Sequence, residues 1–544
     1  MALLVGACAL LQSPSAAAQP GSPGDSSNTE DLTETIPPSE GDIVETIPPE
    51  QQGQSLAPVA PAQEALSDTR VQVSGYARQS LELVYGQLSR VSRNAADPQP
   101  PCAENPTPCL WQDAFISRTQ LVLRASYLQA QHFEATVSGM LGYTLHAAEK
   151  AQLYSRGEID LARGELDAQL REAYVGFFWP AVDLRIGQQR IAWGRSDFQS
   201  PNDVINARDL RDPFLSENEL RYLPTPAIRA SITGGVFTFE AVVSPFFIPD
   251  RFDVYGTNWG AMQRRAYTKY QEFLGESSLL VDQSIERELA PLFRQSERPL
   301  DNGKGTSAGA RISAALPGVD LSAYYHYGYD STPFVQIHPA FLQYVSGTTF
   351  TPGDLSTLEP ALDLINTLGP GGPVSARYLR RHHVGFDLAT TLGPIGLRLD
   401  AAYENRRVFY QVDFNSFQTP TLLGVLSLEY QTGNLDNIVL VELLAQHQLH
   451  DRPAEAQPLL AYERTTTAVA GTLRWMLGDQ WGIDLRGLVG VMPKTYALQP
   501  ALRYKPNDSF LLRLGALLLN GAENSFGWYY GDNDTAFVQL RYAF

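Results

Sequence analysis

The sequence predicts an all-β protein: a transmembrane antiparallel β-barrel of about 18 strands (alternative about 16) that follows a disordered N-terminal extension. Three observations predict it. The 544 residues include 25 Tyr, 24 Phe and 43 Gly, while only 18% are charged. Beyond the N-terminus, no apolar run approaches the roughly 18 residues that a spanning helix needs. Long segments alternate apolar with polar residues, and short turns alternate with longer loops between them.

The N-terminal part is predicted to lie outside the barrel. Residues 1–18 have the apolar run and small-residue end of a signal peptide, but they lack its basic start. Residues 19–70 are rich in Pro, Ser, Glu and Gln, and they carry the motif Glu-Thr-Ile-Pro-Pro at 34–38 and again at 45–49. Such a segment buries too little apolar surface to fold. We expect a disordered periplasmic segment, with partner binding by the repeat as the alternative, and a barrel over 71–544.

Two cysteines lie close together in the first long loop. Cys102 and Cys109 flank a Pro-rich stretch, and the third cysteine falls in the signal peptide. A secreted protein favours a disulfide that closes this loop, with two free thiols as the alternative. No neighbouring histidine supports zinc.

The order of turns and loops is the strongest argument for a closed barrel. Eight short turns are predicted near 129–131, 179–181, 234–235, 316–319, 393–396, 432–436, 477–480 and 505–508. Nine longer connections fall between them, at 89–112, 147–164, 194–226, 247–305, 330–376, 406–418, 449–460, 491–495 and 520–534. These connections divide the chain into an even number of strands, as single-chain bacterial barrels require, with turns on the periplasmic side and loops outside.

The strand faces agree with this order. In 395–404, Ile, Leu, Leu, Ala and Tyr alternate with Gly, Arg, Asp, Ala and Glu, so that one face suits lipid and the other water. Aromatic residues lie beside the short turns, where an aromatic girdle is expected: Trp179, Trp475, Trp481, Tyr504, Tyr542 and Phe544. A β-sandwich array is the alternative. A barrel of this size leaves an aqueous lumen unless loops fill it.

The third long loop is dense in paired charges and is predicted to fold inward as a constriction. The candidate residues are Arg190, Trp193, Arg195, Asp197, Asp203, Asn206, Arg208, Asp209, Arg211 and Asp212. Opposed charges at a constriction create a transverse field that filters solutes by charge. The alternative is that these residues only pair with one another and cap the strand.

This loop also carries a family resemblance. Trp193-Gly-Arg-x-Asp197, followed by Pro201-x-Asp-Val-Ile-Asn-x-Arg-Asp-Leu210, resembles the motif of an uncharacterised family of proteobacterial porin-like outer-membrane proteins. Ala207 departs from the pattern, in which proline is expected. The resemblance implies an outer-membrane channel, sometimes associated with inner-membrane exporters of the resistance-nodulation-division type. It implies no substrate.

Six arginines fall on inferred lumen positions near short turns or the C-terminus. They are Arg398, Arg474, Arg486, Arg503, Arg513 and Arg541, and we expect them to ring the periplasmic exit. Such a ring favours anions and carboxylates, whereas ion pairing between neighbouring strands is the alternative.

The last strand, 536–544, alternates apolar and polar residues and ends on an aromatic residue. Tyr542 and Phe544 resemble the terminal signature that the barrel-assembly machinery reads in bacterial outer-membrane proteins. We therefore expect outer-membrane lipid and this machinery as partners.

Charge and composition narrow the function. A net charge of −18 argues against nucleic acid binding. Eight histidines are scattered without a nucleophile motif, so neither an enzyme nor a cofactor is expected. His382 and His383 point to opposite strand faces, which argues against a metal site. The sequence predicts a channel in the outer membrane of a Gram-negative bacterium for small, anionic or amphiphilic solutes. The alternative is an adhesion or assembly protein that acts through its loops.

Overall fold

The computed structural model describes most of the chain from Thr69 onward. The described residues are 69–85, 115–129, 132–146, 164–216, 218–252, 258–260, 296–297, 304–347, 360, 363–364, 367–368, 374–411, 415–432, 437–450, 464–523 and 525–544. The predicted signal peptide, almost all of the predicted periplasmic segment and the predicted disulfide lie outside them.

Eighteen strands form one antiparallel sheet. The first nine are β1 (Thr69–Val84), β2 (Phe115–Gln129), β3 (Phe133–His146), β4 (Gly164–Trp179), β5 (Val182–Gln189), β8 (Thr225–Gly234), β9 (Phe237–Ser244), β11 (Ser307–Leu316) and β12 (Val319–Tyr329). The other nine are β15 (Arg380–Leu392), β16 (Ile395–Tyr410), β17 (Ser416–Gln431), β18 (Ile438–Gln448), β19 (Thr465–Met476), β20 (Trp481–Met492), β21 (Thr495–Asn507), β22 (Phe510–Gly521) and β23 (Thr535–Ala543).

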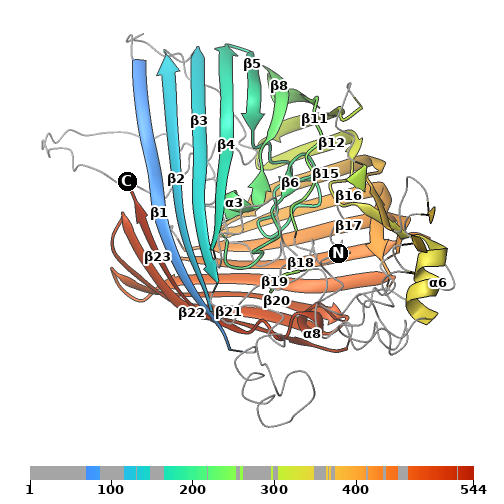
Figure 1. The fold of residues 1–544 in the computed structure, drawn as a ribbon. Coiled ribbons are helices and arrows are strands. Elements are labelled where there is room, and N and C mark those ends of the chain that lie inside the picture. The colour runs from blue at the N-terminus through green and yellow to red at the C-terminus, as the bar shows by residue number, and fades with distance from the viewer. Residues whose placement is uncertain are drawn as a thin grey trace, which may run out of the picture.

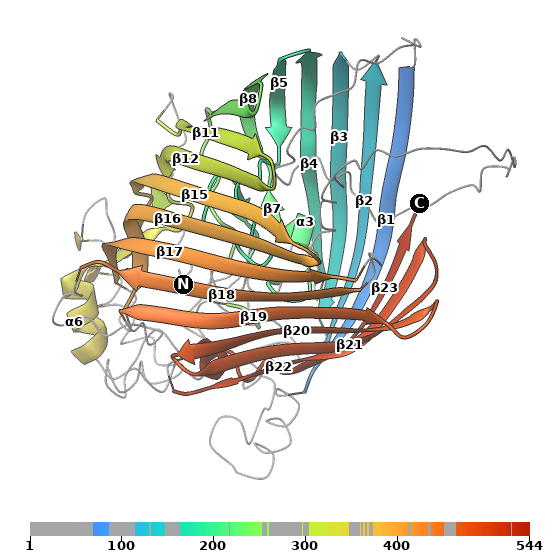
Figure 2. The same cartoon turned by 180° about the vertical axis from the view of Figure 1, so that it is seen from behind.

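The sheet closes on itself, because β1 pairs with β2 on one side and with β23 on the other. Figure 1 shows the blue strand beside the red one, and Figure 2 shows the continuous wall behind them. Each predicted short turn joins two adjacent barrel strands, and each predicted long connection joins the next pair. The prediction of eighteen strands is confirmed, and the alternative of sixteen is excluded.

The two faces of each strand separate as the alternation predicts. On β20, Trp481, Ile483 and Leu485 are exposed, whereas Asp484 and Arg486, which alternate with them, are buried inside the barrel. Because the barrel is closed, the backbone hydrogen-bonding groups along both sides of each barrel strand can pair with a neighbouring strand. The apolar side chains form an outward band that suits lipid. A closed barrel of this kind belongs to the bacterial outer membrane, and the chain is located there.

Aromatic side chains mark the short-turn end of the outer surface. Trp179 and Trp481 are about half exposed, and the rings of Trp481 and Tyr504 lie 4.6 Å apart. Tyr542 and Phe544 join them, since Phe544 pairs its backbone N–H and carbonyl with Gly75 on β1. Their position fits an interfacial girdle.

The remaining elements lie in the long connections. They are β6 (Ala207–Arg208), α3 (Asn218–Arg221), β7 (Tyr222–Leu223), β10 (Ser296–Glu297), β13 (Phe334–Ile337), α6 (Pro339–Gly347), β14 (Val374–Arg377) and α8 (Phe526–Tyr529). β10, β14 and β13 form a small sheet, and β6 pairs with β7. Among the described residues, no helix is long and apolar enough to cross a membrane.

Candidate functional site

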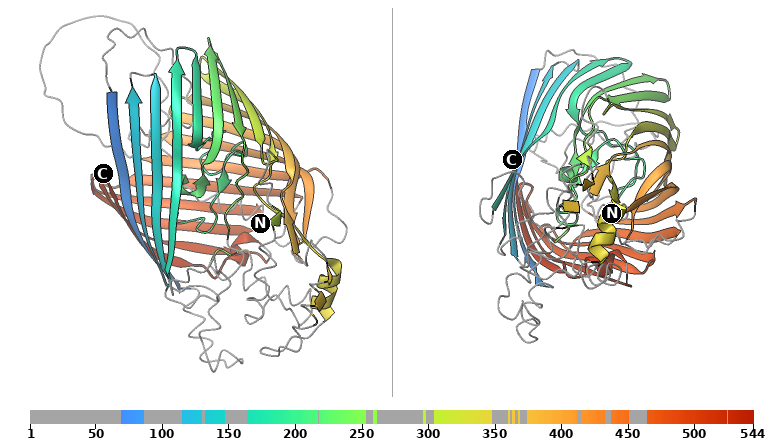
Figure 3. Two further views of the ribbon diagram at one scale, coloured as in Figure 1. Left: turned by 45° about the horizontal axis from the view of Figure 1, so that its top comes forward. Right: turned by 45° about the vertical axis from the view of Figure 1, so that its right-hand side comes forward.

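The connection between β5 and β8, residues 190–224, runs inside the barrel and is here called the inward loop (Figure 3, right). Trp193 is only 1% exposed, and its Nε1 donates to Glu240 on β9 at 2.7 Å. Its ring centroid lies 5.4 Å from that of Tyr324. Glu240 also pairs with Arg229 and Arg311, at 2.7 and 3.1 Å. The motif tryptophan therefore fixes the loop to a charged point on the wall.

Two wall carboxylates hold four consecutive backbone N–H groups of the loop. Asp400 on β16 accepts the first pair, at 3.0 and 2.7 Å, and Glu442 on β18 accepts the second, each at 3.0 Å. Both carboxylates are completely buried. The N–H groups belong to Arg195, Ser196, Asp197 and Phe198.

The motif side chains add ion pairs on the same wall. Arg195 donates through Nε to Asp387 on β15 at 2.8 Å. Asp197 accepts from Arg398 on β16, which also pairs with Glu429 at 2.9 Å. The charged side chains of the Trp-Gly-Arg-x-Asp segment therefore form ion pairs with wall residues of opposite charge.

The loop ends close to where it begins. Asn206 accepts the backbone N–H of Ile191 at 2.8 Å, and its Nδ2 donates to the carbonyl of Leu223 at 3.1 Å. The backbone N–H of Arg208 donates to Asp250 at 2.8 Å. These bonds join the start, the middle and the end of the loop.

Arg190 and Arg208 stack on one aromatic ring within the loop. Their guanidinium carbons lie 4.4 and 5.8 Å from the ring centre of Tyr222. Asp203 is buried beside them, and its carbonyl accepts a bond from Arg208 at 3.4 Å. Burial raises the pKa of Asp203, while the positive charges of Arg208 and Arg190 oppose that rise.

Arg211 and Asp212 tie the loop to β2 and β4. Arg211 donates to Asp167 on β4 at 2.7 Å and also pairs with Asp209. Burial alone would lower the pKa of Arg211, but the hydrogen bonds and charges of Asp209 and Asp167 raise it well above its usual range. Asp212 lies 3.0 Å from Arg118 on β2.

The loop then reaches the opposite side of the lumen. The carbonyl of Phe214 accepts from Gln499 on β21 at 3.5 Å, and the carbonyl of Leu215 accepts from Gln539 on β23 at 3.3 Å and from Arg78 on β1. Since residues 195–198 bind the wall of β16 and β18, the inward loop spans the lumen.

The wall under residues 195–198 is acidic. Five buried carboxylates face the lumen there, and they belong to Asp387, Asp400, Glu404, Glu429 and Glu442. On the loop above this wall, burial raises the pKa of Asp197 to about 7; Arg398 opposes the rise, and Glu442 and Glu429 reinforce it. The protonation of Asp197 therefore changes near neutral pH.

The adjoining wall of β19–β22 is basic. Asp484 on β20 lies 3.6 Å from Arg474, 3.8 Å from Arg503 and 3.3 Å from Arg513, and the charge of Arg486 also acts on it. Arg503 and Arg513 are directly opposite each other on β21 and β22. These four guanidinium groups and one carboxylate are here called the arginine patch, and its net charge is positive.

Of the six predicted lumen arginines, four belong to the arginine patch on one side of the barrel and two lie outside it, so they do not form the predicted ring. Arg541 on β23 stacks over Tyr76, 4.2 Å from its ring centre, next to the patch strands. Arg398 lies on β16 and pairs with the inward loop. All six lie on the last eight of the eighteen strands, β16 to β23, and neighbouring strands follow one another around the barrel, so these residues line less than half of the circumference and cannot form a ring.

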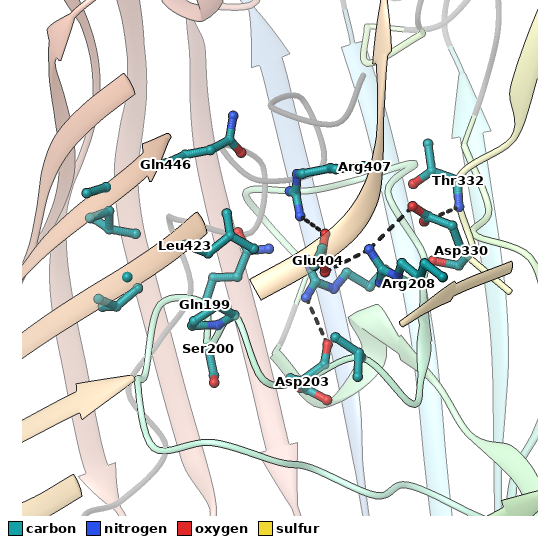
Figure 4. A pocket seen from close by; sticks show the side chains of 18 of the residues that line it. Gln199, Ser200, Asp203, Arg208, Asp330, Thr332, Glu404, Arg407, Leu423 and Gln446 are labelled. Atoms are coloured by element: carbon teal, nitrogen blue, oxygen red, sulfur yellow. Dashed lines mark hydrogen bonds and ion pairs between the residues drawn. The ribbon is translucent and has the colours of Figure 1, made fainter. Parts of the chain in front are cut away.

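A cavity that is open to solvent lies between the inward loop and strands β16–β19. Figure 4 shows charged residues on one side of it and the labelled Leu423 and Gln446 on the other. On the charged side, Arg381 pairs with Glu404 at 2.7 Å and with Asp330 at 3.3 Å, and Arg407 pairs with Glu404 at 2.9 Å.

The histidine pair occupies opposite faces, as predicted. His382 is exposed and contacts the hydroxyl of Tyr325 at 2.8 Å, whereas His383 is fully buried near Glu404. Within the described ranges, no group of three or more His, Cys, Asp or Glu side chains is placed to hold a metal ion.

Several residues of the site were not singled out from the sequence. They are Glu240, Asp387, Asp250, Asp330, Arg381 and Gln446. A charge or amide at a lumen-facing position of an otherwise apolar strand was the available signal for Glu240, Asp387 and Gln446. It does not tell which of them the loop contacts.

Comparison with known proteins places the barrel portion in a family. The model of a family described as "Protein of unknown function (DUF1302)" matches residues 129–544. No curated protein sequence matches the chain.

Several solved structures are similar to this chain. OccAB3 of Acinetobacter baumannii has a TM-score of 0.42 at 9% identity and covers 88% of this chain and 99% of its own. OpdL of Pseudomonas aeruginosa has a TM-score of 0.41 at 12% identity, with the same coverage of 88% and 99%. An anion-selective porin from Comamonas acidovorans has a TM-score of 0.34 at 9% identity, covering 88% and 100%.

Proposed function

We propose that this chain, which belongs to the family described as "Protein of unknown function (DUF1302)", forms a channel for small solutes across the outer membrane. The observation that carries the proposal is the inward loop, which contacts opposite walls of a closed barrel that is wide enough to enclose a lumen. A loop fixed in this way narrows the path and sets the charges along it.

The two walls at the loop carry opposite charge. The acidic wall of β15–β18 adjoins the arginine patch on β19–β22, so a solute passing the loop meets opposite charges on neighbouring parts of the wall. Many acidic groups are already matched: Asp387 by Arg195, and Glu404 by Arg381 and Arg407. The arginine patch keeps an excess of guanidinium groups, which favours anions.

Planar-bilayer recordings of the purified protein test this proposal. We expect single-channel conductance and, under a potassium chloride gradient, a reversal potential that indicates anion preference. Arg486→Ala and Arg503→Ala should each reduce the preference. Lys505→Ala is the matched control, because Lys505 lies at the same end of the barrel but pairs with Asp508 at a short turn. A cation preference that neither arginine variant changes would overturn the anion selectivity.

The same recordings separate the channel from the alternative of an adhesion or assembly protein. A protein that inserts into the bilayer but never conducts would favour that alternative. Coupling to an inner-membrane exporter, which the family resemblance implies, stays a prediction.

A further inference from the structure

The cavity beside the inward loop differs from the polar interior expected of a porin-like barrel. Its wall on β17–β19 is apolar over one row of cross-strand neighbours. Val425 is paired with Leu444, and Leu444 with Ala468, and all three line the cavity. Covering an apolar surface in a water-filled lumen with an apolar molecule lowers the free energy, because both surfaces are removed from water.

The next row of the same wall carries two polar side chains, Gln446 and Thr466. Leu423 is opposite Gln446, and Gln446 is opposite Thr466, again all lining the cavity. Gln446 is 9% exposed and Thr466 is 8% exposed. Gln446 Nε2 and Thr466 Oγ1 are buried and have no hydrogen-bond partner among the residues that the structure describes. A buried amide donor without a partner is unfavourable and is satisfied by an oxygen from a ligand or solvent.

These two polar groups can act on one atom of a ligand. Directly opposite residues of an antiparallel pair have Cβ atoms about 5 Å apart, so Gln446 and Thr466 reach the same point above the wall. Both are uncharged, and two arginines on the other side of the cavity, Arg381 and Arg407, already pair with Glu404. The wall therefore suits a neutral oxygen, such as a hydroxyl or carbonyl, better than a free charge.

We infer that this cavity binds an uncharged, largely apolar molecule that carries at least one hydroxyl or carbonyl oxygen. Its apolar body covers Val425, Leu444 and Ala468, while its oxygen bonds Gln446 Nε2 and Thr466 Oγ1. Figure 4 shows how Leu423 and Gln446 face this space from the side away from Glu404 and Arg208. That this molecule is a solute of the channel rests on the proposed function. Its binding in the cavity does not require conduction.

The test uses 4-bromobenzyl alcohol, which has one apolar ring, one hydroxyl and a bromine atom that X-ray diffraction locates. In crystals of the full chain soaked with this probe, we expect anomalous bromine density among Val425, Leu444 and Ala468. The hydroxyl should lie within hydrogen-bond distance of Gln446 or Thr466. Density at other places only, or a ring turned towards Glu404, would overturn the inference.

Affinity is measured by calorimetry on the protein in lipid nanodiscs, with empty nanodiscs subtracted. Gln446→Leu and the nearly isosteric Thr466→Val should each weaken binding about tenfold, which is the usual effect of losing one hydrogen bond. Thr472→Val is the matched control: Thr472 is also buried on β19, and its hydroxyl likewise has no partner within the described part of the chain, but it does not line the cavity. Equal affinity in all four proteins would contradict the site.

Conductance of the same preparations keeps the two proposals apart. A protein that conducts but does not bind the probe would retain the channel and lose this site. A protein that binds the probe but never conducts would retain the site and lose the channel.

Discussion

Ser196 donates its backbone N–H to Asp400 Oδ2 at 2.7 Å, and its hydroxyl donates to the same oxygen. The backbone N–H of Arg195 donates to this carboxylate as well, at 3.0 Å. Because Asp400 is completely buried on a barrel strand, its position is fixed, and the loop adopts the path that brings these donors to it. A carboxylate in this place acts as a clamp on the backbone of the inward loop.

Asp400→Asn should release this clamp. The amide keeps one acceptor oxygen but turns an N–H₂ donor towards N–H groups that then lack acceptors, at a cost of about 1–3 kcal/mol for each group left without a partner. Hydrogen exchange of residues 190–198 should become faster, while exchange of the barrel strands stays unchanged. Asp508→Asn at a short turn is the control. Unaltered exchange of the loop in Asp400→Asn would show that the carboxylate does not hold it.

Trp193→Phe removes the donor to Glu240 but keeps a ring against Tyr324. Glu240 still pairs with Arg229 and Arg311, so no unpaired carboxylate remains. We expect a moderate loss of loop attachment, about 1.5–3 kcal/mol for a bond to a charged acceptor. The rate of limited proteolysis within 190–224 should rise as the loop becomes less firmly attached. The protease should cleave Trp193→Ala faster than Trp193→Phe, because packing is lost too. Equal cleavage rates for the two variants would assign the whole effect to the hydrogen bond.

The fold was predictable because its signals are local and repeated. Alternation in 395–404 places Leu399 outside and Asp400 inside, and the structure has this arrangement. Short turns such as 393–396 were visible because glycine in the left-handed region permits them; Gly393 has a φ of 62°. Neither signal depends on contacts between distant residues.

The site was predictable only in part. The inward loop was located from its charges, but Asp400 and Glu442 bind its backbone N–H groups, and side-chain identity in the loop does not encode such bonds. The pairing of Trp193 with Glu240 spans 47 residues. The cavity wall depends on the register of β18 and β19, which places Gln446 opposite Thr466; a long connection joins these two strands, so no short turn in the sequence indicates their register.

Gly194→Ala should disrupt the loop at the start of the motif. Gly194 has a φ of 89°, and a Cβ there would lie 1.7 Å from Ser200 Oγ. Gly393→Ala is the matched control: its φ is also positive, but nothing lies within 4 Å of its Cβ position. The control pays only the left-handed cost of about 1–2 kcal/mol. We expect larger, noisier conductance from Gly194→Ala and wild-type conductance from Gly393→Ala; equal behaviour would contradict the steric explanation.

Asp197 should make the selectivity of the channel depend on pH. Its pKa is raised to about 7, chiefly by burial, so the side chain gains a proton as pH falls through neutrality. This removes one negative charge beside Arg398, and the preference for anions should rise between pH 8 and pH 6, about one unit on either side of that pKa. A raised pKa also means that the folded loop binds the proton more tightly than the unfolded chain, so loop attachment weakens as pH rises through 7. Reversal potentials of the Asp197→Asn variant should be independent of pH over this range and equal to those of the wild type at low pH. Asp209→Asn, whose carboxylate pairs with Arg211 elsewhere in the loop, should keep the pH dependence. If Asp197→Asn keeps it as well, another group titrates.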